Sequence, residues 1–162
     1  MEIQKGGCLC GALRYQVSAQ PVRVSFCHCR FCQRATGGPY IVEPIFNSDD
    51  VTLTSGRAKT YDQRSEGSGK IIQLHFCETC GTRLFYTFER FPGLTGVLAG
   101  SFDDPNWFSY DAETAKHIFL DDARDDTVVP AGLPTFQQHA TTRDGTPCEA
   151  TVFDMPHAIR PR

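Results

Sequence analysis

The sequence has no apolar run that approaches the ~18 residues a helix needs to cross a bilayer. It has no basic excess either: 16 lysines and arginines stand against 19 acidic residues, for a net charge of -3. Proteins that bind nucleic acid usually carry a basic stripe, so this charge balance argues against that class. The stretch from Glu2 to Lys5 is polar, and no apolar signal-peptide core follows it. We therefore expect a cytoplasmic protein with neither nucleic acid nor a membrane as partner.

Several signatures of catalysis are also missing. The sequence has no nucleophile elbow and no dinucleotide fingerprint, and Gly67-Ser68-Gly69-Lys70 has the wrong spacing for a phosphate loop. There is no internal repeat and no low-complexity tract. The chemistry of this chain must therefore come from another set of residues.

The pattern of apolar residues predicts a mainly β protein with few short helices. Hydrophobic residues make up 40% of the chain, enough for a packed core, and many alternate with polar ones as in half-buried strands. The expected strands cover residues 13–17, 22–26, 40–42, 51–54, 70–76, 83–88 and 94–99. Helical character is confined to Arg30 to Ala35 and to Asp111 to His117.

The composition changes near residue 121 toward Asp, Pro, Thr and Gly. Leu120 to Asp126 is typical of a solvated loop, and the tail from Thr141 has little periodicity apart from Thr151 to Phe153. We expect one domain over residues 1–136 and a C-terminal extension over residues 137–162, packed on the domain or partly mobile.

Eight cysteines are the most informative feature of the chain. They occur as Cys-x-Cys, Cys-x-Cys-x-x-Cys and Cys-x-x-Cys, with one cysteine alone: Cys8 and Cys10, then Cys27, Cys29 and Cys32, then Cys77 and Cys80, and finally Cys148. Disulfides do not persist in a reducing compartment, and cysteines one or two residues apart are better placed to hold one ion than to join distant segments. The spacing therefore predicts zinc.

Two of these groups have the form of zinc knuckles. Glycine follows the last cysteine in each, as Gly11 after Cys10 and Gly81 after Cys80. A residue without Cβ lets the backbone turn back toward the sulfur atoms. Structural zinc takes four protein ligands, so we pair the two groups into one closed site of Cys8, Cys10, Cys77 and Cys80. We call these four residues the paired-knuckle cluster.

The middle group, Cys27, Cys29 and Cys32, is one ligand short of a closed site, and we call it the triple-cysteine cluster. Three protein ligands and an open position are typical of catalytic zinc. Two alternatives remain: a site closed by Cys148, His28 or His75, or three thiols without metal. In an extended segment the His28 side chain would point away from a metal held by its neighbours.

Other polar residues allow weaker predictions. Arg30 and Arg34 flank the cluster and are candidates to bind a substrate carboxylate, although solvated surface arginines fit the sequence equally well. His75 is expected to be a packed histidine, and Cys148 a bystander.

The cysteine segments resemble those of the glutathione-dependent formaldehyde-activating (GFA) family, also called the CENP-V/GFA domain. The resemblance rests on Gly7-Cys8-Leu9-Cys10-Gly11, Cys27-His28-Cys29-Arg30-Phe31-Cys32 and Phe76-Cys77-Glu78-Thr79-Cys80-Gly81-Thr82, and it covers roughly residues 5–136. Segments 100–105 and 116–119 are also similar, in the family's order. Where family members often carry an aromatic residue, this chain has the acidic stretch from Asp121 to Asp126.

This resemblance implies the Mss4-like (β-tent) fold, clamped by a structural zinc at the paired-knuckle cluster. It also implies a second, catalytic zinc at the triple-cysteine cluster, hence two zinc ions per chain. We expect the second zinc to be the one that purified protein can lose, since exposed thiolates oxidise. The family's activity is that of a carbon–sulfur lyase acting in reverse, which joins glutathione and formaldehyde as S-(hydroxymethyl)glutathione. The expected partners are a small-molecule thiol such as glutathione and a small aldehyde.

Two other functions fit the sequence. A zinc-stabilised binding module without chemistry would have its middle cysteines closed by a fourth protein ligand or free of metal. A methionine sulfoxide reductase of the B type has the same fold and paired knuckles, but it needs a catalytic cysteine on a late strand. The one late candidate, Cys148, follows Gly145-Thr146-Pro147 in a turn-like setting, which argues against this function.

Overall fold

The computed structural model describes residues 2–160, which form two compact units. Unit 1 contains the chain up to Arg23 together with Glu43–Ser109, and unit 2 contains Val24–Val42 and the chain from Tyr110 onward. Each unit is therefore built from segments far apart in the sequence. The division predicted near residue 136 stays a prediction.

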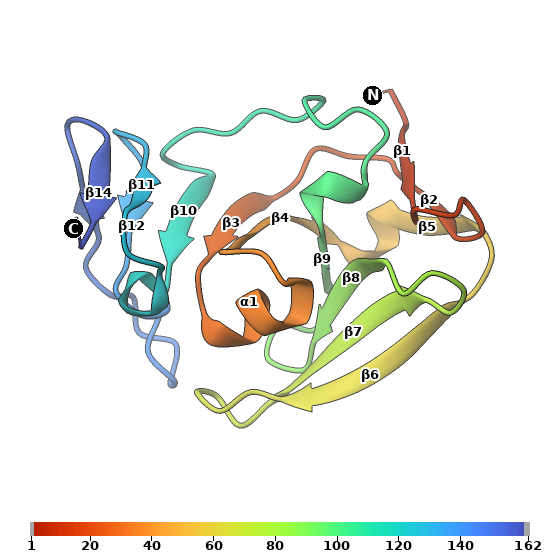
Figure 1. The fold of residues 1–162 in the computed structure, drawn as a ribbon, viewed down its shortest axis with the longest axis horizontal. Helices are drawn as coiled ribbons and strands as arrows, with labels where there is room; N and C mark the ends of the chain where they lie inside the picture. Colours follow the sequence, from red (N-terminus) through yellow and green to blue (C-terminus); the bar gives the residue numbers. More distant parts are fainter. Residues whose placement is uncertain (1, 161–162) are drawn as a thin grey trace. The chain divides into compact units, whose positions relative to one another are not determined.

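Unit 1 consists of antiparallel strands (Figure 1). A three-stranded sheet has the order β1-β2-β5, and a second series has the order β4-β9-β8-β7-β6. The strands are β1 (Gln4–Gly7), β2 (Arg14–Val17), β4 (Ile41–Asn47), β5 (Val51–Ser55), β6 (Ala58–Arg64), β7 (Ile71–Cys77), β8 (Arg83–Phe88) and β9 (Leu94–Val97). The mainly β class predicted from the alternating pattern is confirmed.

The core of unit 1 contains side chains from both sheets. Tyr15 of β2, Phe46 of β4, and Leu84 and Phe85 of β8 belong to one buried cluster. The rings of Tyr15 and Phe85 meet edge to face, with centroids 4.9 Å apart, a favoured arrangement for aromatic pairs. Cys8 and Cys77 belong to the same cluster, so the apolar core fixes one cysteine of each knuckle.

Unit 2 holds the helix and the remaining strands. The strand order is β13-β12-β10-β3, with β11 and β14 as a separate antiparallel pair. The elements are β3 (Arg23–Cys27), α1 (Arg30–Thr36), β10 (Ala115–Ile118), β11 (Thr127–Val129), β12 (Pro134–Thr135), β13 (Thr151–Val152) and β14 (His157–Ile159). The tail thus supplies one strand to each of these two sheets.

Helix α1 has clear start and stop signals. Cys29 is its N-cap, and the Cys29 sulfur accepts a hydrogen bond from the Cys32 amide. At the other end Gly37 adopts a left-handed conformation (φ 76°), and its amide donates to the Gln33 carbonyl. The predicted helical turn over residues 30–35 is confirmed, and it holds the last two cysteines of the triple-cysteine cluster in fixed register.

The helix predicted over Asp111 to His117 is wrong. Asp111 Oδ1 accepts hydrogen bonds from the amides of Glu113 and Thr114, which closes a turn, and β10 follows directly. Strand β10 pairs in parallel with β3, placing His117 opposite Phe26. Pairing with a distant strand outweighed local helical propensity, which is a weak determinant for short segments.

The solvated loop predicted over Leu120 to Asp126 is only partly correct. Residues Leu120–Asp122 form a short 3-10 helix, and Leu120 and Ala123 are buried. They form a small core with Val129 and Ile159, so this segment is anchored at its apolar positions. The many aspartates of this segment led to the prediction of a solvated loop, although its two apolar residues are buried.

Candidate metal centres

The paired-knuckle cluster lies in unit 1. The Sγ atoms of its four cysteines all lie within 4.8 Å of one another. Sγ of Cys10 is 3.5 Å from that of Cys8 and 3.8 Å from that of Cys77. Four thiolates around one zinc at about 2.3 Å would have edges of about 3.8 Å, so the donor set and its spacing fit tetrahedral zinc.

The two knuckles have the same backbone hydrogen-bonding pattern. The amide of Gly11 donates to the Cys8 carbonyl over 3.0 Å, and the amide of Gly81 donates to the Cys77 carbonyl over 2.9 Å. Both glycines have positive φ, 76° and 72°, a conformation that L side chains rarely adopt. The glycine after each cysteine group therefore has the conformational role that its position predicts.

Thr82 connects the two knuckles. Its hydroxyl lies 3.1 Å from Cys80 Sγ and accepts a hydrogen bond from the Leu9 amide, also at 3.1 Å. Hydrogen bonding to Thr82 lowers the pKa of Cys80 to about 5, because a donor at the sulfur favours the thiolate. Sequence reasoning missed Thr82, although it directly follows the Cys-x-x-Cys-Gly motif.

The remaining thiols share protons unequally. Burial alone would raise the pKa of Cys8, but the Leu13 amide, 3.2 Å from its sulfur, and the Cys10 thiol outweigh burial and lower it. The pKa of Cys10 is raised to about 12: the Ala12 amide lowers it, but Cys8 and Cys80 raise it by accepting its proton. A divalent cation would replace such shared protons, which is how metal binding releases protons from a thiol cluster.

The triple-cysteine cluster lies in unit 2, where β3 leads into α1. Its three Sγ atoms lie within 4.8 Å of one another, and those of Cys27 and Cys29 are 3.5 Å apart. Hydrogen bonds from Cys27 and then Cys32 lower the pKa of Cys29 to about 3, while the pKa values of Cys27 and Cys32 are raised well above their usual range. The cluster thus readily carries one negative charge. Its sulfur donors and spacing suit zinc with three protein ligands.

The candidates for a fourth ligand lie elsewhere. His28 is fully buried, and its Nε2 lies 3.1 Å from Nδ1 of His117. His75 Nε2 lies 2.9 Å from the Thr87 hydroxyl, and Cys148 is exposed. In the described part of unit 2, no other cysteine, histidine, aspartate or glutamate belongs to the ligand group.

The His28–His117 pair was not foreseen from the sequence, because the two residues are 89 positions apart. Burial lowers the pKa of both histidines to about 4, so the pair is neutral near neutral pH. The His117 ring stacks on Phe26 with centroids 4.5 Å apart. The pair therefore joins β10 to the residue that directly follows β3, between the first two cysteines of the triple-cysteine cluster.

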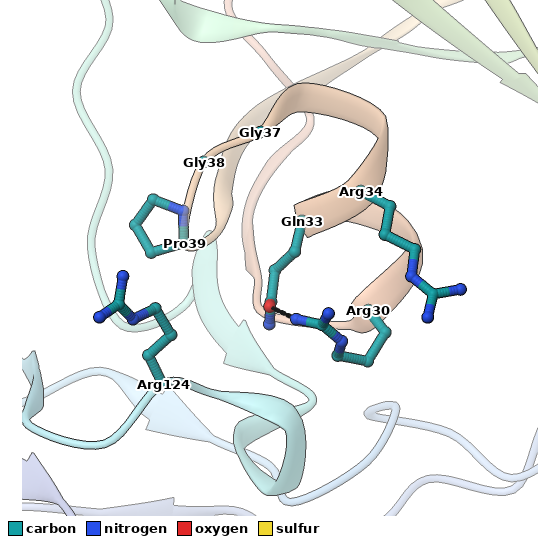
Figure 2. A pocket seen from close by; sticks show the side chains of 7 residues that line it. All are labelled: Arg30, Gln33, Arg34, Gly37, Gly38, Pro39 and Arg124. Atoms are coloured by element: carbon teal, nitrogen blue, oxygen red, sulfur yellow. Dashed lines mark hydrogen bonds between the residues drawn. The ribbon is translucent and has the colours of Figure 1, made fainter.

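A pocket of about 250 Å³ adjoins α1 (Figure 2). Its lining includes Arg30 and Arg34, both predicted as candidate substrate contacts, and also Arg124, which the sequence did not single out. Gln33 lies between them and accepts a hydrogen bond from Arg30 (Figure 2). The other lining residues are Gly37, Gly38 and Pro39.

These features define a mainly β protein with two cysteine clusters, each able to hold a metal ion. Residues 3–122 match the family model described as "Glutathione-dependent formaldehyde-activating enzyme". The match covers well over half of the chain, so this protein belongs to the GFA family, as the resemblance predicted.

Curated relatives are distant. A Halomonas elongata protein named "Putative glutathione-dependent formaldehyde-activating enzyme" is 28% identical over 102 residues, which are 61% of this chain and 65% of the relative. The chain thus spans just under two thirds of that relative's length. A Schizosaccharomyces pombe protein, named an uncharacterized lyase, is 22% identical over 121 residues, 75% of this chain and 81% of the relative.

Among solved structures, the crystal structure of a Rhodobacter sphaeroides protein is similar, with a TM-score of 0.50 and 23% identity. The similarity covers 61% of this chain and 87% of that one, and it supports the fold alone. Within residues 2–160 no helix is long and apolar enough to cross a membrane.

Proposed function

We propose that this protein is a zinc-dependent carbon–sulfur lyase of the S-(hydroxymethyl)glutathione synthase type, with its reaction centre at the triple-cysteine cluster. The observation that carries the proposal is the convergence of three sulfur atoms without a fourth protein ligand in the described part of unit 2. An open position of this kind is typical of catalytic rather than structural zinc. Family membership supports glutathione and formaldehyde as the reactants.

The second cluster has a different role in this proposal. Cys8, Cys10, Cys77 and Cys80 form a full set of four thiol ligands within 4.8 Å, which leaves no position for a substrate. They would hold a structural zinc that stabilises unit 1. Each chain would therefore bind two zinc ions with separate functions.

The reaction joins the glutathione sulfur to the formaldehyde carbon. When bound, zinc would supply positive charge that lowers the pKa of a thiol at the open position. The thiolate sulfur attacks the carbonyl carbon, the new carbon–sulfur bond forms, and the carbonyl oxygen takes up the proton that the thiol released. The product, S-(hydroxymethyl)glutathione, contains all atoms of both reactants.

The chain's own residues would hold this geometry. Cys29 stays fixed as the N-cap of α1 through the Cys32 amide, 3.4 Å from its sulfur. His28 is held away from the sulfur atoms by His117. Arg30 and Arg34, both on α1, would bind a carboxylate of the substrate by charge-assisted hydrogen bonds.

Zinc content and exchange kinetics together test the proposal. Freshly reduced protein is assayed for zinc, and exchange between free and glutathione-bound ¹³C-formaldehyde is followed by NMR. We expect two zinc ions per chain and exchange faster than in buffer. Cys29→Ser should lose one zinc and the acceleration, whereas the matched control Cys148→Ser, at an exposed cysteine outside both clusters, should keep both. Exchange at the buffer rate with both zincs bound would instead favour a binding module.

A further inference from the structure

The pocket beside α1 contains only positive charge. Three of its lining residues are arginines and none is acidic. Among the described residues, Arg30, Arg34 and Arg124 form no ion pair: the ion pairs join Arg14 to Asp103, Lys70 to Glu89 and Arg160 to Asp125. Unpaired guanidinium groups gathered in one pocket favour an anion that can accept several N–H donors.

Arg124 reaches this pocket because its backbone is held on both sides. The Arg124 carbonyl accepts hydrogen bonds from the amide and the hydroxyl of Thr127, at 3.1 and 2.6 Å. Ala123, just before it, is buried in a small apolar core. The side chain of Arg124 is exposed and extends toward Pro39 (Figure 2).

The acidic neighbours do not neutralise Arg124. Asp125 pairs with Arg160, whose Nε lies 2.9 Å from its carboxylate. Arg160 also donates to the carbonyl groups of Asp121 and Ala123, which clamps the loop from the side of β14. The loop that was predicted to be acidic and solvated therefore presents a free guanidinium group to the pocket.

Gln33 links this pocket to the triple-cysteine cluster. Its Nε2 donates to the carbonyl of His28, which lies between Cys27 and Cys29, and to the carbonyl of Asp122, at 2.8 Å. Its Oε1 accepts from Arg30. The Gln33 side-chain amide thus links three parts of the site by hydrogen bonds: the cysteine segment, the loop that carries Arg124 and the guanidinium group of Arg30.

The dimensions suit a short peptide thiol. Helix α1, which carries Cys32, Arg30 and Arg34, has seven residues and is therefore about 10 Å long. An extended tripeptide spans about the same length. A ligand with its sulfur at the cysteines would have its carboxylate within reach of the pocket.

We infer that Arg30 and Arg124, positioned by Gln33, form a subsite that selects thiols bearing a free carboxylate, with Arg124 as a specificity residue. This inference rests on the proposed function for the identity of the thiol. Arg124 lies beyond residues 3–122, the segment matched by the family model, so the family match does not by itself account for this residue. Arg34 also lines the pocket, but its side chain extends away from Gln33 (Figure 2).

The test compares glutathione with its diethyl ester, in which both carboxylates are masked, in formaldehyde exchange. For the wild type we expect kcat/KM to fall roughly 10- to 100-fold with the ester, as for loss of charge-assisted hydrogen bonds. Arg124→Ala and Arg30→Ala should raise KM for glutathione about tenfold or more, leave kcat unchanged and leave the ester unaffected. The KM of Arg124→Lys for glutathione should lie between those of the wild type and Arg124→Ala, because lysine keeps the positive charge but lacks the planar guanidinium group that can donate two parallel hydrogen bonds.

The control is Arg143→Ala, which removes an exposed arginine of the same unit outside the pocket and should behave as wild type. Equal losses with both thiols, or no loss with either, would overturn the subsite. Calorimetric binding of S-methylglutathione gives a readout that needs no turnover. If Arg124→Ala weakens this binding and Arg143→Ala does not, the subsite stands even where the wild type fails to accelerate exchange; unchanged binding in Arg124→Ala refutes it.

Discussion

The side-chain amide of Gln33 donates a hydrogen bond of 2.8 Å to the carbonyl oxygen of Asp122, a residue 89 positions later in the chain. Gln33 is only 6% exposed, and its second acceptor is the carbonyl of His28. Helix α1 and the segment just before it are thus joined to the loop that carries Arg124 through one buried side chain. This relationship makes Gln33 a sensitive position for both stability and ligand binding.

Gln33→Leu should destabilise the protein by about 1–3 kcal/mol, because two carbonyl groups lose their donor in a buried setting. Urea unfolding followed by circular dichroism measures the change. Gln138→Leu is the matched control, since the Gln138 amide binds Asp121 on the exposed surface and should contribute no more than about 0.5 kcal/mol. Equal stabilities of the two variants would show that the buried link is energetically unimportant.

The two cysteine clusters should respond differently to substitution. Cys80→Ser removes one of four ligands of a structural site whose binding energy is folding energy, so we expect unfolding or aggregation. Cys29→Ser should leave a folded protein that lacks one zinc. Thermal melting measures the stability of both variants, and elemental analysis measures their zinc content. Equal losses of stability in both variants would argue against separate structural and catalytic roles.

Gly81, in the second knuckle, differs from Gly100 in backbone conformation rather than in packing. A Cβ at Gly81 would meet no atom within 4 Å, and neither would one at Gly100, but only Gly81 has positive φ. Gly81→Ala should therefore cost about 1–2 kcal/mol of conformational strain and weaken zinc binding. Gly100→Ala should change stability by less, or raise it slightly. Urea unfolding at fixed zinc concentration compares the two, and similar values would exclude a conformational cause.

Acid should destabilise the protein through His117. Burial, aided by His28, lowers the pKa of His117 from 6.5 to about 4, so the unfolded chain binds this proton more readily than the folded one. This contribution to the unfolding free energy is complete above pH 6.5 and is lost as the pH falls toward 4. The loss at pH 5 is about 2 kcal/mol. The pH dependence of the unfolding free energy should be less steep in His117→Gln than in the wild type. Parallel curves would show that His117 does not titrate in this range.

Local features of the chain were readable from the sequence. The spacing of the cysteines and the glycine after each knuckle define turns only a few residues long, so near neighbours determine them. The alternation around Tyr15 and the capped helix after Cys29 are local in the same sense. The pairing of the two knuckles was inferred because four thiol ligands complete a tetrahedral site.

Strand β6 and strand β10 were missed or misassigned for a common reason. Strand β6 is mostly exposed and polar, and it is extended because every residue from Ala58 to Arg64 pairs with β7. Strand β10 depends likewise on β3. Pairing with a partner distant in sequence leaves little trace in the strand's own residues.

The sequence by itself determined the mainly β class, the two cysteine clusters and the family. Only the tertiary structure decided that His28 faces His117, that Gln33 holds the Asp122 loop, and that Arg124 enters the pocket with Arg30. Each of these contacts joins residues about 90 positions apart. Their formation depends on how the elements pack, because no short segment of the chain carries the information that brings such residues together.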